Sequence, residues 1–237
     1  MQLLPPLTRD PKVVAREAPA GRHLPYARHL DERTIETRDG LLMQTIRLGG
    51  LLFETADSEE LNYRAELRDA MLRAIGNSRF AIYHHLLRRR ADAAMSANFP
   101  DQFSERLDER WRARLSHRQL YVNELFLTIV RRPTQGRMGI ADRLKGLFAS
   151  ATDNRAALRA AEKHSLDNAR EALVAALGQY DPHVLSTYES DDGTRSEPLE
   201  FLAYIFNGDM RPIVLPHGDI GHHLPARRVS FGLDTVE

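Results

Sequence analysis

The chain has 237 residues, of which 42% are hydrophobic and 28% are charged, so it can bury a sizeable core in one large domain or two small ones. Its 33 basic residues balance its 33 acidic residues, which removes the electrostatic argument for a dedicated nucleic-acid binder. The absence of cysteine excludes disulfides, thiolate metal sites and cysteine catalysis, and no apolar run is long enough to span a bilayer.

The first 30 residues carry five prolines and show no sustained hydrophobic period. We expect residues 1–30 to form an extended arm that lies on the surface or on a partner. The prolines are Pro5, Pro6, Pro11, Pro19 and Pro25.

A hairpin is predicted next, with strands at Thr34–Arg38 and Leu41–Leu48 around the turn Arg38-Asp39-Gly40. Asp-Gly between apolar or β-branched flanks is a strong hairpin signal, because glycine tolerates the positive φ that a primed turn requires. A further short strand is expected at Leu51–Glu54.

Two helices and an intervening strand are predicted from residue 57 to residue 118. Asp57 can cap the first helix, and a strand at Arg79–Leu87 has apolar residues on both faces, which indicates an internal position in its sheet. The apolar face of the first helix consists of Leu67, Ala70, Met71, Ala74 and Ile75. The helix over 101–118 has an inner stripe of Phe103, Leu107, Trp111 and Leu115.

The rest of the chain mixes strands and helices. Strands are predicted at Tyr121–Val130, Val184–Tyr188 and Val229–Phe231, and helices near 140–148, from Thr152 to about 179 and at Pro198–Phe206, with a polar loop at Glu189–Glu197. The stripe of the long helix is Leu166, Ala169, Leu173, Ala176, Leu177 and Tyr180. This pattern predicts an α+β fold with helices on a mostly antiparallel sheet, over residues 31–237, with two subdomains at 31–133 and 134–237.

Four stretches, in this order, carry a family resemblance. They are DGLLMQTIRLGGLLFET (39–55), YVNELFLTIVRRP (121–133), SEPLEFLAYIFNG (196–208) and ARRVSFGLDTVE (226–237). Together they resemble the N-terminal domain of the CagE/TrbE/VirB family, the large ATPases of type IV secretion and conjugal-transfer machines.

The resemblance implies that this chain is the front part of a longer protein, without the RecA-like motor domain that follows in the family. It implies a hexameric parent that hydrolyses ATP with magnesium, is cytoplasmic and lies peripherally at the inner membrane. The expected partners are other subunits of a type IV secretion machine, a small inner-membrane subunit and further copies of the chain itself.

Nucleotide binding by this chain is not expected. A phosphate-binding loop needs G-x-x-x-x-G-K-[ST], so that backbone amides wrap the phosphates and a hydroxyl meets magnesium. In the nearest stretch, residues 136–146, Leu144 precedes Lys145 and Gly146 follows it. The loop cannot form there, and a loop that enters a short helix is expected instead.

Histidines are the next candidates. His84 and His85 are adjacent on a strand, so they point to opposite faces and cannot chelate one ion. His217, His222 and His223, with Asp219, lie in a loop that could fold around zinc, although no H-E-x-x-H helix supplies a base. A loop with solvated histidines is the alternative.

Other catalytic patterns are weak. Ser186, Ser196 and Ser230 have no G-x-S-x-G signature, and the carboxylate pairs are explained by a solvated loop and by a helix's first turn. The pairs are Asp191-Asp192 and Glu59-Glu60.

Three arginine clusters lie at the ends of predicted strands, at Arg88–Arg90, Arg131-Arg132 and Arg227-Arg228. A shared rim could bind the phosphates of nucleic acid or anionic lipid, whereas solvated strand ends are the simpler interpretation. The Trp111 stripe is expected to be core, and the proline-rich arm is the favoured docking segment.

These observations predict an assembly domain without chemistry of its own: no catalytic, cofactor-binding or metal-binding residues, and a role in docking a secretion motor to the inner-membrane complex and to itself. Two alternatives stay open, a stand-alone metal-dependent hydrolase that uses the 217–223 histidine loop, and a nucleic-acid-binding module.

Overall fold

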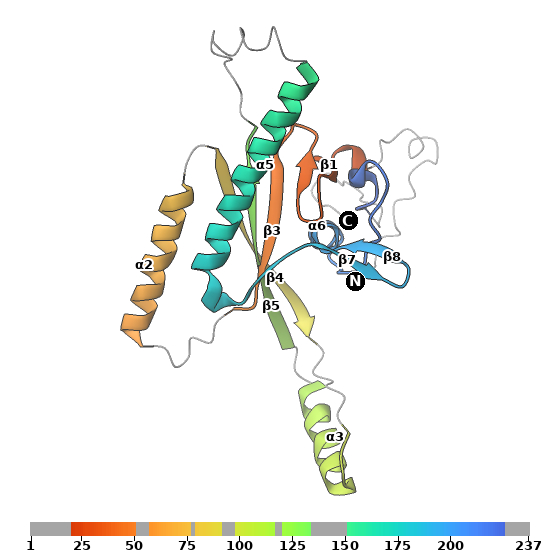
Figure 1. Ribbon diagram of the computed structural model, residues 1–237. Coiled ribbons are helices and arrows are strands. Elements are labelled where there is room, and N and C mark those ends of the chain that lie inside the picture. Colours follow the sequence, from red (N-terminus) through yellow and green to blue (C-terminus); the bar gives the residue numbers. More distant parts are fainter. Residues whose placement is uncertain are drawn as a thin grey trace, which may run out of the picture. The chain divides into compact units, whose positions relative to one another are not determined.

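The computed structural model describes residues 20–50, 57–76, 79–91, 98–116, 120–133 and 151–225 (Figure 1). These residues divide between two compact units, one built from the two ends of the chain, up to Gln44 and from Leu185, and the other from Thr45 to Val184. Both units combine helices with antiparallel strand pairs, which confirms the predicted α+β class.

The first unit contains the predicted hairpin. Strand β2 (Ile35–Thr37) pairs antiparallel with the first residues of β3 (Leu42–Leu48), with Ile35 opposite Met43. Gly40 has φ +84°, and its N–H donates to the Thr37 carbonyl over 3.0 Å. Asp39 keeps a negative φ, so this is a type I turn followed by a glycine bulge rather than the primed turn that the sequence suggested.

Tyr26–His29, placed in the extended arm by the sequence, instead forms strand β1 and pairs antiparallel with β2. A short 3-10 helix, η1 (Ala20–Arg22), precedes it. The remainder of the predicted arm, residues 1–19, lies outside the described residues. The edge of the sheet in this unit is therefore a strand that begins in a proline-flanked segment.

The C-terminal part of the first unit is a small hairpin followed by a helix. Strands β7 (Thr187–Ser190) and β8 (Gly193–Ser196) occupy part of the predicted polar loop, which is a correction. Helix α6 (Glu197–Asn207) has Ser196 as its N-cap and Gly208 as its C-cap. Gly208 has φ +73° and ends the helix, as predicted. The 3-10 helix η3 (Ile220–His222) contacts β1.

Apolar side chains from these elements form the core of the first unit. The largest fully buried ones are Ile35, Leu42, Leu199, Phe201, Ile220 and Leu224. They come from the hairpin, from α6 and from η3 and the residues just after it, so segments far apart in the sequence are held together by hydrophobic burial.

The second unit contains the other part of β3, helix α2 (Ser58–Ile75), strand β4 (Phe80–Ala91), helix α3 (Gln102–Ser116), strand β5 (Leu120–Arg131), helix α5 (Ala151–Ala176), the 3-10 helix η2 (Gly178–Tyr180) and strand β6 (Pro182–Val184). In its sheet, β3 pairs with β6 on one side and lies next to β5 on the other, and β4 follows β5. The predicted strand Val184–Tyr188 is thus split between β6 and β7.

Strands β4 and β5 form an antiparallel hairpin of 12 residues each, in which Phe80 is opposite Arg131 and Ala91 is opposite Leu120 (Figure 1). The prediction that β4 is internal is wrong for the described part of the chain, where β4 pairs with β5 alone and ends the strand order. Tyr83 and Leu86 are 55% and 58% exposed. Apolar residues on both faces of a strand therefore do not by themselves show that the strand is buried.

Helices α2 and α5 pack in this unit, and α5 also contacts β5. Asp57 caps α2 as predicted, accepting from the N–H of Glu60 over 2.8 Å. Of the predicted apolar face of α2, Leu67 is half-buried and Ala70 is exposed, and the structure does not describe the side chains of Met71, Ala74 and Ile75. The α5 stripe is confirmed: Leu166, Leu173 and Leu177 are buried with Phe126 and Ile129 of β5.

The predicted elements at Leu51–Glu54, 140–148 and Val229–Phe231 lie outside the described residues. Among the described residues, no helix has the length and apolar character that crossing a bilayer requires.

Candidate functional site

The histidine loop does not assemble as a metal site. His217, His222 and His223 are exposed, and Asp219 is engaged elsewhere. One oxygen of Asp219 accepts from the guanidinium of Arg38 over 2.8 Å, and the other accepts from the N–H of Gly221 over 2.9 Å. Within the described ranges, no group of three potential ligands is positioned to hold a metal ion.

An open hollow of about 510 Å³ lies beside this loop, lined by parts of β1 and by residues 215–219. Its charged groups have partners within the unit: Arg28 pairs with Glu36 at 2.7 Å, and Asp219 pairs with Arg38. The hollow therefore offers little uncompensated charge to a ligand.

Sequence reasoning missed one serine–histidine pair. The Nε2 atom of His29 lies 2.9 Å from the hydroxyl of Ser196, and its Nδ1–H donates to the carbonyl of Asp31 over 3.0 Å. Burial lowers the pKa of His29, which favours the neutral ring, and its Nε2 atom accepts a hydrogen bond from the Ser196 hydroxyl. The 167 positions between the two residues explain why no local motif could have found the pair.

This pair resembles a nucleophile and its base, but its surroundings indicate a structural role. Ser196 is completely buried, and its hydroxyl oxygen also accepts from the N–H of Leu199 as the cap of α6. A nucleophile must reach a substrate, whereas this hydroxyl fastens α6 to β1. Of the other serines, Ser186 donates its N–H to Glu197, and Ser230 lies outside the described residues.

The remaining polar candidates are also explained locally. Asp192, in the β7–β8 turn, accepts from Arg195 over 2.8 Å, which lowers the pKa of the Asp192 carboxyl. Glu60 pairs with Arg64 one turn further along α2. His84 is exposed and His85 is half-buried on β4, where burial and His84 lower the pKa of His85. The loop-like stretch 136–146 lies outside the described residues.

The arginine clusters do not form one rim. Arg88–Arg90 lie inside β4 rather than after it, and they are opposite Tyr121–Asn123 of β5. Arg131 is opposite Phe80 at the other end of the same hairpin, roughly 30 Å away at strand spacing.

Arg131 is also unavailable to a ligand. It is 4% exposed, and its guanidinium lies 5.4 Å from the ring of Phe80. Burial lowers the pKa of Arg131, and the nearby carboxylate of Glu162 opposes that shift. Arg227 and Arg228 lie outside the described residues.

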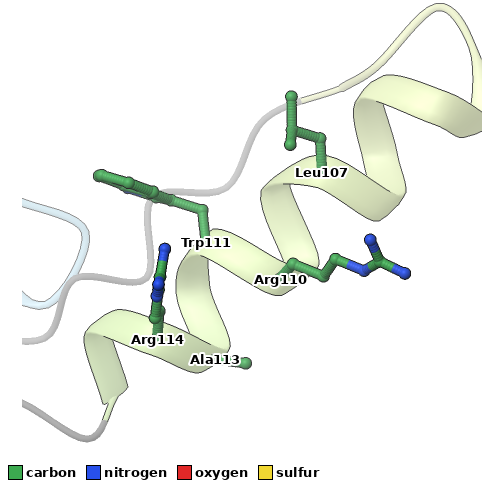
Figure 2. A pocket seen from close by; sticks show the side chains of 5 residues that line it. All are labelled: Leu107, Arg110, Trp111, Ala113 and Arg114. Atoms are coloured by element: carbon green, nitrogen blue, oxygen red, sulfur yellow. The ribbon is translucent and has the colours of Figure 1, made fainter.

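Helix α3 carries the feature that stands out. Three of the four residues of its predicted inner stripe are exposed: Phe103 is 76%, Leu107 60% and Trp111 60% accessible, and the structure does not describe the side chain of the fourth, Leu115. The expectation that the Trp111 stripe is core is therefore wrong, because no described element covers it. Figure 2 shows Leu107, Trp111 and Arg114 projecting to one side of the helix, beside an open hollow of about 540 Å³.

A row of large, exposed apolar residues on a helix is typical of an interaction surface. Tryptophan and arginine, which dominate the most energetic positions of protein interfaces, are both present.

Comparison with known proteins bears on the identity of this chain. Residues 33–138 match the family described as type IV secretion system ATPase VirB4/TrbE, N-terminal domain.

Three curated relatives align with nearly all of the chain. The type IV secretion system protein virB4 of Bartonella quintana is 29% identical over 230 residues, 95% of this chain and 29% of the relative. The virB4 protein of Brucella suis biovar 1 is 29% identical over 90% of this chain and 26% of its own length. PtlC of Bordetella pertussis is 27% identical over 95% of this chain and 27% of its own length. The chain thus spans less than a third of these relatives, and the resemblance found in the sequence is confirmed.

Proposed function

We propose that this chain, whose residues 33–138 belong to the family of VirB4/TrbE N-terminal domains, is a non-catalytic assembly domain of a type IV secretion ATPase. It docks the motor to the inner-membrane complex and to further copies of itself. It acts on the cytoplasmic side, peripherally at the inner membrane. ATP and magnesium are bound by the RecA-like part of the parent hexamer.

The exposed apolar row of α3 is the observation that carries this proposal beyond the family match. Burying a Leu, Phe or Trp side chain is favourable by about 1.5–3 kcal/mol. Burying the three exposed side chains of this row against a partner would therefore stabilise the complex considerably. The polar groups that could have supported catalysis are instead used as caps and ion pairs. The exposed apolar row, together with polar groups that serve as caps and ion pairs, favours a role in binding over a role in catalysis.

The test is co-purification from the bacterium that encodes the chain. A tagged chain should recover other subunits of the secretion machine from detergent-solubilised membranes, identified by mass spectrometry. Leu107→Glu with Trp111→Glu should reduce that recovery at least several-fold. Leu158→Glu is a matched control, because Leu158 is 48% exposed on α5. Recovery of no secretion subunit by the unaltered chain would contradict the proposal.

A second measurement addresses catalysis directly. The purified chain, given ATP and magnesium, should release phosphate no faster than a protein-free sample. Turnover that one substitution in this chain abolishes would overturn the non-catalytic assignment. The metal-dependent hydrolase gains no support, because Asp219 is occupied by Arg38 and Gly221.

A further inference from the structure

Helix α3 is organised in rows of one residue type, because residues four apart lie above one another on a helix. The apolar row consists of Phe103, Leu107 and Trp111. The basic row consists of Arg106, Arg110 and Arg114, and the acidic row consists of Asp101, Glu105 and Glu109. All nine of these residues are exposed.

The rows are not placed evenly around the helix. At about 100° per residue around the helix axis, the direction of Arg110 lies roughly 60° from the direction of Leu107. The direction of Glu109 lies roughly 160° from that of Leu107, which is almost the opposite face of the helix. The basic row therefore flanks the apolar row, and the acidic row faces away. A neutral set of charges is thus separated into a basic side that adjoins the apolar row and an acidic side opposite.

Asp108 and Arg112 are the remaining charged residues of α3 and neutralise each other as an i,i+4 ion pair. They lie on the flank that does not carry the basic row, so they add no net charge beside the apolar residues. The ligand that fits α3 must accept aromatic and aliphatic side chains and present negative charge along one edge.

We propose that α3 binds the surface of an anionic lipid bilayer, with its apolar row among the acyl chains and its arginines at the lipid phosphates. This inference rests on the proposed function, because it supplies a direct membrane contact for a domain placed at the inner membrane. Interfacial helices have this distribution, with Trp, Phe and Leu on one face and basic residues beside them.

Two features favour a bilayer over a protein groove or a nucleic acid. The apolar row ends in Trp111, and tryptophan prefers the membrane–water interface. The acidic row lies across a helix about 10 Å in diameter, which exceeds the Debye length of about 8 Å at physiological salt. The carboxylates therefore weaken the attraction of the arginines only slightly. A nucleic acid would leave the apolar row in water.

The chain contains a built-in reporter for the test, because Trp111 is its only tryptophan. The full chain is titrated with vesicles of phosphatidylglycerol and phosphatidylcholine in equal parts. Trp111 emission should shift to shorter wavelength, and the protein should sediment with the vesicles. Raising the salt from 50 mM to 500 mM should weaken binding strongly, because basic residues attract anionic lipid through screened electrostatics.

Substitutions separate the two rows. Arg106→Gln with Arg110→Gln and Arg114→Gln should lower partitioning about a hundredfold, given the energy per basic residue near an anionic surface. Leu107→Glu should abolish sedimentation. The matched control is Glu105→Gln with Glu109→Gln, which removes charge from the far side and should leave binding equal or slightly tighter. Circular dichroism confirms that each variant is folded.

Several results would overturn the inference: no emission shift and no sedimentation, equal binding to pure phosphatidylcholine vesicles, an unchanged affinity in the triple arginine variant, or a shift with duplex DNA but none with vesicles. The first of these, together with recovery of secretion subunits by the tagged chain, would leave the assembly role intact and show that α3 contacts protein instead. Loss of that recovery with intact vesicle binding would overturn the assembly role alone.

Discussion

Replacing Gly40 by valine should destabilise the first unit by about 2 kcal/mol. Gly40 has φ +84° in the turn between β2 and β3. A side chain in the left-handed region costs roughly 1–2 kcal/mol, and a β-branched one more, because Cβ crowds the following carbonyl. The strain falls on the turn that sets the register between Ile35 and Met43.

The assay is thermal unfolding followed by circular dichroism. For a chain of this size, about 1 kcal/mol lowers Tm by roughly 2–4 °C, so Gly40→Val should lower Tm by about 4–8 °C. Gly40→Asn is the matched control, because asparagine tolerates the left-handed region, and should lower Tm by less than half as much. An unchanged Tm for the valine variant, or equal losses for both variants, would refute the turn assignment.

Three further predictions concern buried polar groups. Glu162→Gln should cost about 1–3 kcal/mol in urea unfolding, because the buried Glu162 carboxylate accepts from Arg159 over 3.0 Å and favours the charged form of the buried Arg131, and an unchanged stability would contradict this. Ser196→Ala should cost about 1–3 kcal/mol, since α6 loses its cap and His29 its partner; a neutral effect would remove the structural role of the hydroxyl. Burial lowers the pKa values of His29 and His85 below 6.5, so the unfolded chain binds protons more readily than the folded chain. The stability that these residues contribute is therefore complete above about pH 6.5. It should be lost as the pH falls through their lowered pKa values. In urea unfolding between pH 7 and pH 5, His29→Gln should flatten that slope, and an identical slope would contradict the assignment.

Local signals in the sequence predicted much of the fold. Asp57 and Gly208 mark helix ends because their side-chain and backbone chemistry is specific to those positions, and the turn glycine marks the hairpin for the same reason. The α5 stripe was correct because a partner, β5, covers it.

The errors share one cause: periodicity shows that a face is apolar but not what covers it. Phe103, Leu107 and Trp111 have the spacing of a core stripe, yet they are exposed on α3. Tyr83 likewise contributes to the apolar pattern that predicts an internal β4, yet its side chain is 55% exposed. The bond between His29 and Ser196 joins residues far apart in sequence, so neither residue alone could indicate it.

The register of the β4–β5 hairpin has a consequence for how this part of the chain can vary. Ala91 and Leu120 are partners across the ladder, so the insertion that contains α3 leaves and re-enters the sheet at adjacent points, about 5 Å apart. The segment between Ala91 and Leu120 can therefore be exchanged, lengthened or replaced by a two-residue turn without altering the pairing of β4 with β5. Exchange of this one segment would change the surface that α3 presents and leave the paired strands unchanged.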